Sequence, residues 1–320
     1  METCYSPQKS NITSYGATIV AITTLEAFAG MWINAFIACV LCIGWIKKKT
    51  LNSNEKIVLL LGCTRFCSLC CSWAYSFFSI IYPNYFYVRP VLQLAVFFQA
   101  FFNHCNLWVS ACLCVFYCIK IANFRNSFFI YLKVRIDRMV LWLFFGSGIL
   151  ALGIGIIAYD VADRPHCNNR NNTREGNFGR ANIKMDKHFF PSFFLTGFGY
   201  AASFMAVIFA AVFLLFSLWR HKCKMQKNSM KDLSMEAHIR AMKSIFSFLV
   251  MYSINFVCLV LKMVYVTKKG SYMTFLIIVF EYTFPGLHSL ILIFSNPKLE
   301  KTLLKILPLE RSVKHKICMS

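Results

Sequence analysis

The chain has 320 residues, of which 58% are hydrophobic and only 15% are charged, so it has too little polar surface to cover a soluble domain of this size. Its 34 Lys and Arg against 13 Asp and Glu give a net charge of +21. These bases lie in short runs between long apolar stretches rather than on one face of a globular body, which disfavours nucleic-acid binding. The composition indicates a protein that lies in a membrane.

Seven stretches are long and apolar enough to cross a bilayer as helices, which takes about 20 residues each. Strands of a membrane barrel would be shorter and would alternate in polarity, so we predict an all-α membrane protein built as a seven-transmembrane helix bundle. An extracellular segment, 1–15, precedes the bundle at 16–294, which includes a long outer loop at 162–190, and a cytoplasmic tail, 295–320, follows it. The predicted spans cover roughly residues 16–46, 56–82, 91–119, 139–161, 189–219, 241–266 and 272–294.

The distribution of Lys and Arg predicts the orientation in the membrane. Twenty-two of them fall after the first, third, fifth and seventh spans, and ten fall on the other side. Because cytoplasmic loops carry the excess of bases, we expect a multi-pass protein of the plasma membrane with its N-terminus extracellular and its C-terminus cytoplasmic. Two glycosylation acceptors, Asn11 and Asn171, lie on the predicted outer side.

The 15 Cys are spread mainly through the spans, where Cys behaves as a small apolar residue. Cys67 and Cys70 have the spacing of a metal-binding pair, but no second pair or His accompanies them. We therefore expect neither a metal nor another cofactor. Cys4 and Cys167 lie on the predicted outer side, where a disulfide is chemically allowed, although we expect them to remain unpaired.

The segment after the seventh span predicts a short amphipathic helix on the inner leaflet. Asn296 and Pro297 are typical of an N-cap and a first helical residue. Leu299 and Leu303 then share an apolar face, with lysines around it that suit anionic lipid.

The end of the third span carries the most specific motif in the chain. It resembles the bitter taste receptor (taste receptor type 2) family's run FYxLKIANFSN with its following LKxRI, and differs at Ile119 and Arg125. Further matches lie at 217–221, 237–241 and 288–293, so the resemblance covers essentially the whole membrane body. The motif reads Phe116-Tyr117-Cys118-Ile119-Lys120-Ile121-Ala122-Asn123-Phe124-Arg125-Asn126, followed by Leu132-Lys133-Val134-Arg135-Ile136.

Ionisable side chains within the spans need polar partners, and Arg65 is the most informative of them. We expect Asn34, Glu26 or backbone carbonyls of neighbouring helices to satisfy its guanidinium. The resemblance implies that Glu26, Asn34 and Arg65 form a structural polar cluster that holds the first helices together.

Polar residues in the outer half of the spans predict a ligand site. Gln99 and Asn103 share a helical face. Each of these residues can instead make only helix-to-helix hydrogen bonds. Glu281 can pair with a cationic ligand or bond a neighbouring helix. The resemblance matches Asn103 and His104 to an Asn-His pair of the family, and places Gln99 where many members have Trp. It matches Tyr252 to a Tyr deep in the pocket, and Asn255 lies one turn above Tyr252. Ile278 lies at the place where some members have an acidic residue.

The resemblance implies a G-protein-coupled receptor that binds small bitter compounds and activates a gustducin-type or other inhibitory G protein. The cytoplasmic ends of the spans would face that G protein, although basic loops are also what membrane orientation requires. The sequence leaves open whether the receptor forms oligomers. The residues expected on the G-protein side are Tyr117, Lys120, Arg125, His221, His238 and Arg240.

Two alternative functions are compatible with the same seven-span topology. Another chemosensory receptor, such as a vomeronasal type 1-like one, is disfavoured by the motif at 120–124. A seven-span transporter or enzyme would need an internal repeat, metal ligands or paired acids, whereas His104, His221 and His288 are scattered over different depths. We therefore do not expect an enzyme.

Overall fold

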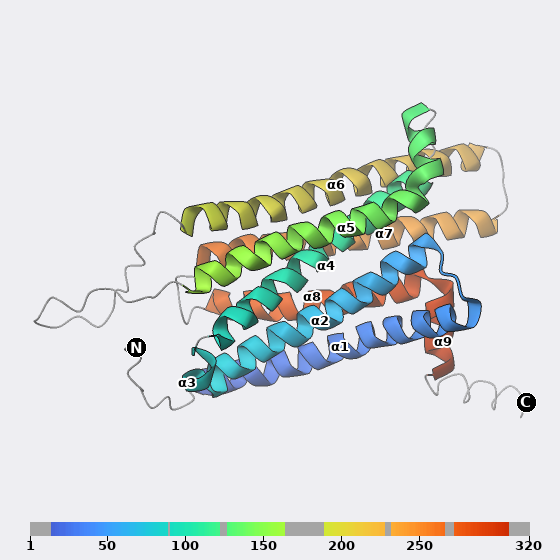
Figure 1. Cartoon of the computed structure of the whole chain (residues 1–320). Coiled ribbons are helices and arrows are strands. Elements are labelled where there is room, and N and C mark those ends of the chain that lie inside the picture. The colour runs from blue at the N-terminus through green and yellow to red at the C-terminus, as the bar shows by residue number, and fades with distance from the viewer. Residues whose placement is uncertain are drawn as a thin grey trace, which may run out of the picture.

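The computed structural model of the chain describes residues 14–88, 90–121, 127–163, 189–227, 232–265 and 272–306, and these residues form helices and no strand. Seven of the helices are long and apolar enough to cross a membrane, which confirms the predicted seven-span bundle (Figure 1). They are α1 (Ser14–Lys48), α2 (Ser53–Ile81), α4 (Val91–Ile121), α5 (Ser127–Asp163), α6 (Phe189–Lys227), α7 (Asp232–Tyr265) and α8 (Tyr272–Ser295). Two short helices, α3 (Pro83–Phe86) and α9 (Pro297–Ile306), complete the described elements.

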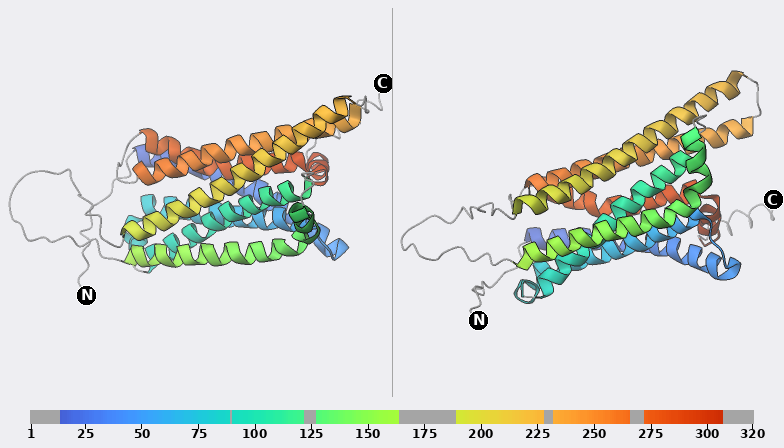
Figure 2. Two further views of the ribbon diagram at one scale, coloured as in Figure 1. Left: turned by 90° about the horizontal axis from the view of Figure 1, so that it is seen from above. Right: turned by 45° about the horizontal axis from the view of Figure 1, so that its top comes forward.

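The spans differ from their predicted bounds mainly at one end of the bundle. The fourth span is predicted to begin at 139, whereas α5 begins at Ser127. The segment 127–138 is too basic to be recognised as membrane-spanning, but a helix can continue into water, and Ile136 packs against the core while its basic neighbours remain exposed. The helices α6 and α7 likewise continue past their apolar stretches, and Figure 2 shows them projecting beyond the rest of the bundle.

Helix α4 occupies the centre of the bundle and packs against α2, α5 and α6. Within the protein, 67% of its membrane-spanning window is buried, more than in any other described span. Polar side chains on α4 therefore face other helices rather than lipid, and a polar site in this protein must involve it.

Two apolar clusters hold the helices around α4. One joins α1, α2, α5, α8 and α9 to it through residues such as Leu41, Leu61 and Leu113. The other joins α6, α7 and α8 to it through Val207 and Tyr252, among others. The two clusters meet along α4 and α8, where the buried polar residues described below lie.

The end of the bundle that carries α9, the α1–α2 connection and the first turn of α5 is called the basic end here, and the end that carries α3 is called the opposite end (Figure 1). The predicted short helix after the seventh span is confirmed as α9. Asn296 caps it by accepting a hydrogen bond from the Lys298 backbone N–H, 3.0 Å. Leu299 of α9 is fully buried in the first apolar cluster, so this helix is docked onto the bundle.

Candidate functional site

A cavity lies between five of the spans, closer to the opposite end than the buried Arg65 is. About 480 Å³ of its space is free of atoms, in part open to the outside, but only about 40 Å³ admits the centre of a water molecule. Ligand pockets commonly measure 300–1,000 Å³, so a cavity of about 40 Å³ is much smaller than a typical ligand site, and the helices would have to move apart to admit a ligand. The lining residues are Ser68, Leu69 and Ser72 of α2, Asn103, Asn106 and Leu107 of α4, Tyr200 of α6, Asn255 and Leu259 of α7, and Glu281, Tyr282, Phe284 and Pro285 of α8.

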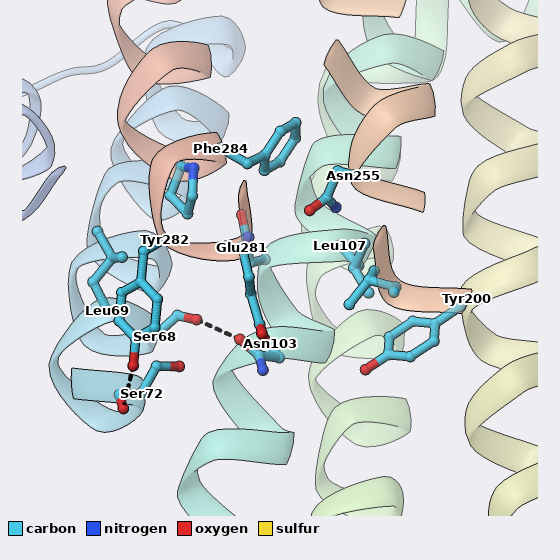
Figure 3. A pocket seen from close by; sticks show the side chains of 13 residues that line it. Ser68, Leu69, Ser72, Asn103, Leu107, Tyr200, Asn255, Glu281, Tyr282 and Phe284 are labelled. Carbon is cyan, nitrogen blue, oxygen red and sulfur yellow. Dashed lines mark hydrogen bonds between the residues drawn. The ribbon is translucent and has the colours of Figure 1, made fainter. Parts of the chain in front are cut away.

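Hydrogen bonds between helices fix the wall formed by α2 (Figure 3). Ser68 Oγ donates to Asn103 Oδ1 of α4, 2.6 Å, and the Tyr282 hydroxyl of α8 donates to the Ser72 carbonyl oxygen, 2.6 Å. Ser68 and Ser72 are four residues apart and so share one helical face. This face lets α2 bond α4 and α8 at the same level of the bundle.

The charged part of the cavity lies where α7 meets α8. Lys262 Nζ contacts both carboxylate oxygens of Glu281, at 2.6 and 2.7 Å. The Lys262 side chain is 41% exposed and that of Glu281 18%. Four residues on, Pro285 has no N–H to donate, which leaves the carbonyl oxygen of Glu281 without its usual intrahelical donor.

Arg65 of α2 lies behind the cavity and is fully buried. Its guanidinium donates from Nε to Asn106 Oδ1, 3.1 Å, and from Nη1 to Ser289 Oγ, 2.8 Å. Nη2 bonds Ser110 Oγ at 3.4 Å and the Nδ1 atom of His288. Four of its five N–H groups therefore have neutral partners on two neighbouring helices, α4 and α8, and the charge is not paired with a carboxylate.

This network assigns the protonation state of His288. An arginine has only donors, so the His288 Nδ1 that bonds Arg65 must accept, and the imidazole is neutral with its proton on Nε2. Phe248 and Phe284 pack beside the ring, with centroids 4.3 and 5.7 Å away.

The partners of Arg65 differ from the predicted ones. Asn34 joins the network only through Ser289, whose hydroxyl donates to Asn34 Oδ1 at 2.7 Å. Glu26 lies apart: it is about 12 Å along α1 from Asn34, it faces Thr283, and its Oε2 has no hydrogen-bond partner among the described residues. The reason is that the guanidinium of Arg65 extends toward α4 and α8, where its partners Asn106 and Ser289 lie, rather than toward the face of α2 that packs on α1.

Of the predicted ligand-site residues, the structure brings Asn103, Asn255 and Glu281 together on the cavity wall. His104 instead stacks on Tyr200, with ring centroids 4.9 Å apart, and Nδ1 contacts the Ala100 carbonyl oxygen at 2.9 Å. His104 therefore packs against the lining residue Tyr200 and is not itself among the described lining residues.

Three other predicted residues lie outside the described lining. Tyr252 is fully buried beneath the cavity, with its hydroxyl 3.5 Å from the Leu107 carbonyl oxygen. Gln99 is half-buried one turn from Asn103. Ile278 packs against the apolar cluster of Ala27, Met31, Leu69 and Tyr282.

Five polar residues contribute to the wall without having been predicted. Ser68, Ser72 and Asn106 are buried, and Tyr200 and Tyr282 add their hydroxyl-bearing rings. A serine in a membrane helix commonly bonds its own backbone, so its presence in a span carries little information. The only signal in the sequence is the spacing Thr64, Ser68, Ser72, which places hydroxyls on one face beside Arg65.

The basic end has a second, open cavity lined by Tyr117, Lys120, Asn54 and Asp137, among others. Lys120 Nζ lies 3.3 Å from Asp137 Oδ1, with both side chains about half exposed, so this pair is weakly stabilising. Of the residues predicted on the G-protein side, His221 lies within α6, and His238 and Arg240 lie within α7. Arg125, Asn11, Asn171, Cys4 and Cys167 lie outside the described residues.

Seven spanning helices around a polar cavity, followed by a short helix docked at one end, are the architecture of seven-helix G-protein-coupled receptors. A family model described as taste receptor protein (TAS2R) matches residues 12–311. The chain therefore belongs to the taste receptor type 2 family, the bitter taste receptors.

Individual relatives support the same assignment over most of the chain. The chain is 31% identical over 305 residues to taste receptor type 2 member 7 of Macaca mulatta, with 91% of this chain and 92% of the relative covered. It is 29% identical to taste receptor type 2 member 9 of Homo sapiens over 304 residues, with 91% and 93% covered. These relatives are receptors rather than enzymes.

Proposed function

We propose that this chain is a bitter taste receptor that binds small bitter compounds in the five-helix cavity and activates a gustducin-type or other inhibitory G protein. The observation that carries this proposal is the position of the cavity. It is lined by amide and hydroxyl groups, bounded by Tyr200, Tyr282 and Phe284, and set among the spans of a chain that belongs to the bitter taste receptor family. A few polar groups within an aromatic wall are typical of a small-molecule site.

We further propose that the opposite end is extracellular and that the chain lies in the plasma membrane. The excess of Lys and Arg at the basic end supports this orientation. The orientation is tested with an N-terminal epitope tag, which antibodies should reach on intact cells. Replacement of Asn11 and Asn171 by Gln should remove glycan mass if both are outside, whereas Asn171→Gln that reaches the surface normally would exclude a trafficking role for that glycan.

The contacts of the cavity provide a route from ligand to G protein. Asn106 both lines the cavity and accepts the Arg65 hydrogen bond, and Arg65 in turn bonds α8 through Ser289 and His288. A ligand that fits the cavity better when the helices move apart would favour that arrangement and shift the population of states. Because the cavity is narrow here, the described conformation corresponds to the arrangement with lower ligand affinity.

The G protein would bind at the basic end. Tyr117 and Lys120 of α4 lie beside the second cavity there, and the extended ends of α6 and α7 carry His221, His238 and Arg240. Movement of α6 or α7 relative to α4 would change the opening between them. The positive charge of this end also suits anionic lipid of the cytoplasmic leaflet.

The function is tested by measuring intracellular calcium in cells that express the chain with a gustducin-tailed promiscuous G protein, against a panel of bitter compounds. A receptor-dependent response to any compound supports the proposal. Silence despite surface expression shown by the epitope tag would count against a bitter receptor and favour another chemosensory role.

A further inference from the structure

The ion pair between Lys262 and Glu281 determines the charge of the cavity. Glu281 is the only acidic or basic side chain among the described lining residues, and both of its oxygens are held by Lys262 Nζ at 2.6 and 2.7 Å. A carboxylate on the wall of a ligand site would ordinarily attract ammonium compounds. Here its charge is already neutralised by the adjacent helix.

The exposure of the two side chains indicates which of them can be displaced at the lower cost. Glu281 is 18% exposed on the cavity wall, and Lys262, at 41%, extends toward it from the last turn of α7. A displaced Lys262 ammonium could become hydrated, so displacement costs little burial. A cationic ligand must nevertheless compete with an ammonium that is permanently tethered to the same site.

The covalent attachment of the Lys262 ammonium determines how strongly it competes with a cationic ligand. A group held by a short flexible chain has an effective concentration on the order of 1 mM. If an ammonium group binds this carboxylate with a Kd of about 0.1 mM, the tethered competitor weakens the apparent affinity for a cationic ligand by about 1 mM/0.1 mM, or about tenfold. The second positive charge nearby, Arg65, lies directly behind the lining residue Asn106 and adds repulsion for a cation.

The remaining polar groups of the wall are uncharged. They are the hydroxyls of Ser68, Ser72 and Tyr200 and the amides of Asn103 and Asn255. Since Asn103 Oδ1 already accepts from Ser68, the amide nitrogen of Asn103 is the group left to donate to a ligand oxygen. Hydroxyl, ether and carbonyl groups on a ligand would match this wall.

We propose that Lys262 acts as a built-in counter-ion that occupies Glu281, so that the cavity selects uncharged, hydrogen-bonding ligands over ammonium compounds. The inference rests on the proposed function, in that it takes the five-helix cavity as the ligand site. Lys262 is a specificity-determining residue in this scheme, and replacing it should convert the same cavity into a cation site.

The test is direct binding of tetraalkylammonium ions, from tetramethyl to tetrabutyl, to the purified full-length chain in detergent. The variant Lys262→Met keeps the length of the side chain but removes its charge. It should bind at least one of these ions about tenfold more tightly than the unmodified chain. Lys262→Arg keeps the counter-ion and should behave as the unmodified chain does. The double variant Lys262→Met with Glu281→Gln should lose the gain.

The outcomes separate the inference from the receptor function. Equal affinity of the unmodified chain and Lys262→Met for every ion would overturn the inference, as would a gain that persists in the double variant, because binding would then not involve Glu281. A gain that depends on Glu281 supports the inference even if the calcium assay is silent, a result that would count against the proposed function alone.

Discussion

The guanidinium of Arg65 on α2 and the hydroxyl of Ser289 on α8 lie 2.8 Å apart, although 224 residues separate them in the chain. Ser289 passes the interaction on to Asn34 of α1, 2.7 Å away, so one hydroxyl joins three helices. The arrangement explains how an arginine is held in the apolar interior of the bundle without a carboxylate beside it.

Replacement of Ser289 by Ala removes two buried hydrogen bonds, one of them to a charged group. We expect a loss of about 1.5–3 kcal/mol of stability, seen as a lower melting temperature of the purified protein in detergent. Ser295→Ala is a matched control, since Ser295 is exposed and bonds the Ile291 carbonyl oxygen of its own helix. Equal melting temperatures for the two variants would show that the network contributes nothing to stability.

Close packing of Gly30 of α1 against α2 and α8 predicts a second effect. A Cβ atom added at Gly30 would lie 2.7 Å from Leu69 Cδ1 and 3.8 Å from the Gly286 backbone. Alanine can be accommodated by a shift of the Leu69 side chain, but the branched side chain of Gly30→Val must push the helices apart, at about 1–3 kcal/mol. Thermal unfolding should show little change for Gly30→Ala and a clear loss for Gly30→Val.

The control for this packing effect is Gly148→Val. A Cβ atom added at Gly148 of α5 meets nothing within 4 Å. Destabilisation of the Gly148 variant to the same extent would mean that valine acts through helix propensity rather than through contact of α1 with α2 and α8.

The fold follows from the sequence because each span must satisfy its backbone within itself, and a long apolar run leaves only a helix. Hydropathy marks where a helix leaves the bilayer, not where it stops, so the start of α5 at Ser127 was not predictable from apolar residues. The start of α9 after its cap Asn296 was predictable, because the signal for a helix cap lies in a few neighbouring residues.

The site was predictable in part. That Arg65 needs buried polar partners follows from its charge, but the choice of Asn106 and Ser289 over Glu26 depends on which helices pack together at that depth. The same holds for Lys262 and Glu281, which are visible in the sequence as two ionisable residues in different spans. Their contact becomes evident only once α7 lies beside α8.

Ligand response should distinguish two neighbouring residues of α4. Asn103 lines the cavity, whereas Gln99, one turn away, is not among the described lining residues. For an agonist found by the calcium assay, Asn103→Ala should raise the half-maximal concentration about tenfold, the effect of losing one good hydrogen bond. Gln99→Ala should leave the half-maximal concentration unchanged. If Gln99→Ala raised it and Asn103→Ala did not, the ligand would lie nearer the opposite end.

The last prediction concerns the docking of α9. Lys298 Nζ contacts Glu55 Oε1 at 2.6 Å, and the side chains are 35% and 17% exposed. Glu55 Oε2 also accepts the Asn52 backbone N–H in a capping box, a bond that Gln can keep, so Glu55→Gln isolates the charge.

A double-mutant cycle of Glu55→Gln with Lys298→Met should give a coupling energy of about 0.5–1 kcal/mol from thermal unfolding, reduced at high salt. The pair Lys120 and Asp137 provides the comparison, because its exposures of 48% and 57% allow water to screen it, and its coupling should be near zero. If the two pairs gave equal coupling, burial would not be what strengthens the contact between Glu55 and Lys298. The attachment of α9 would then depend on Leu299 and its apolar neighbours alone.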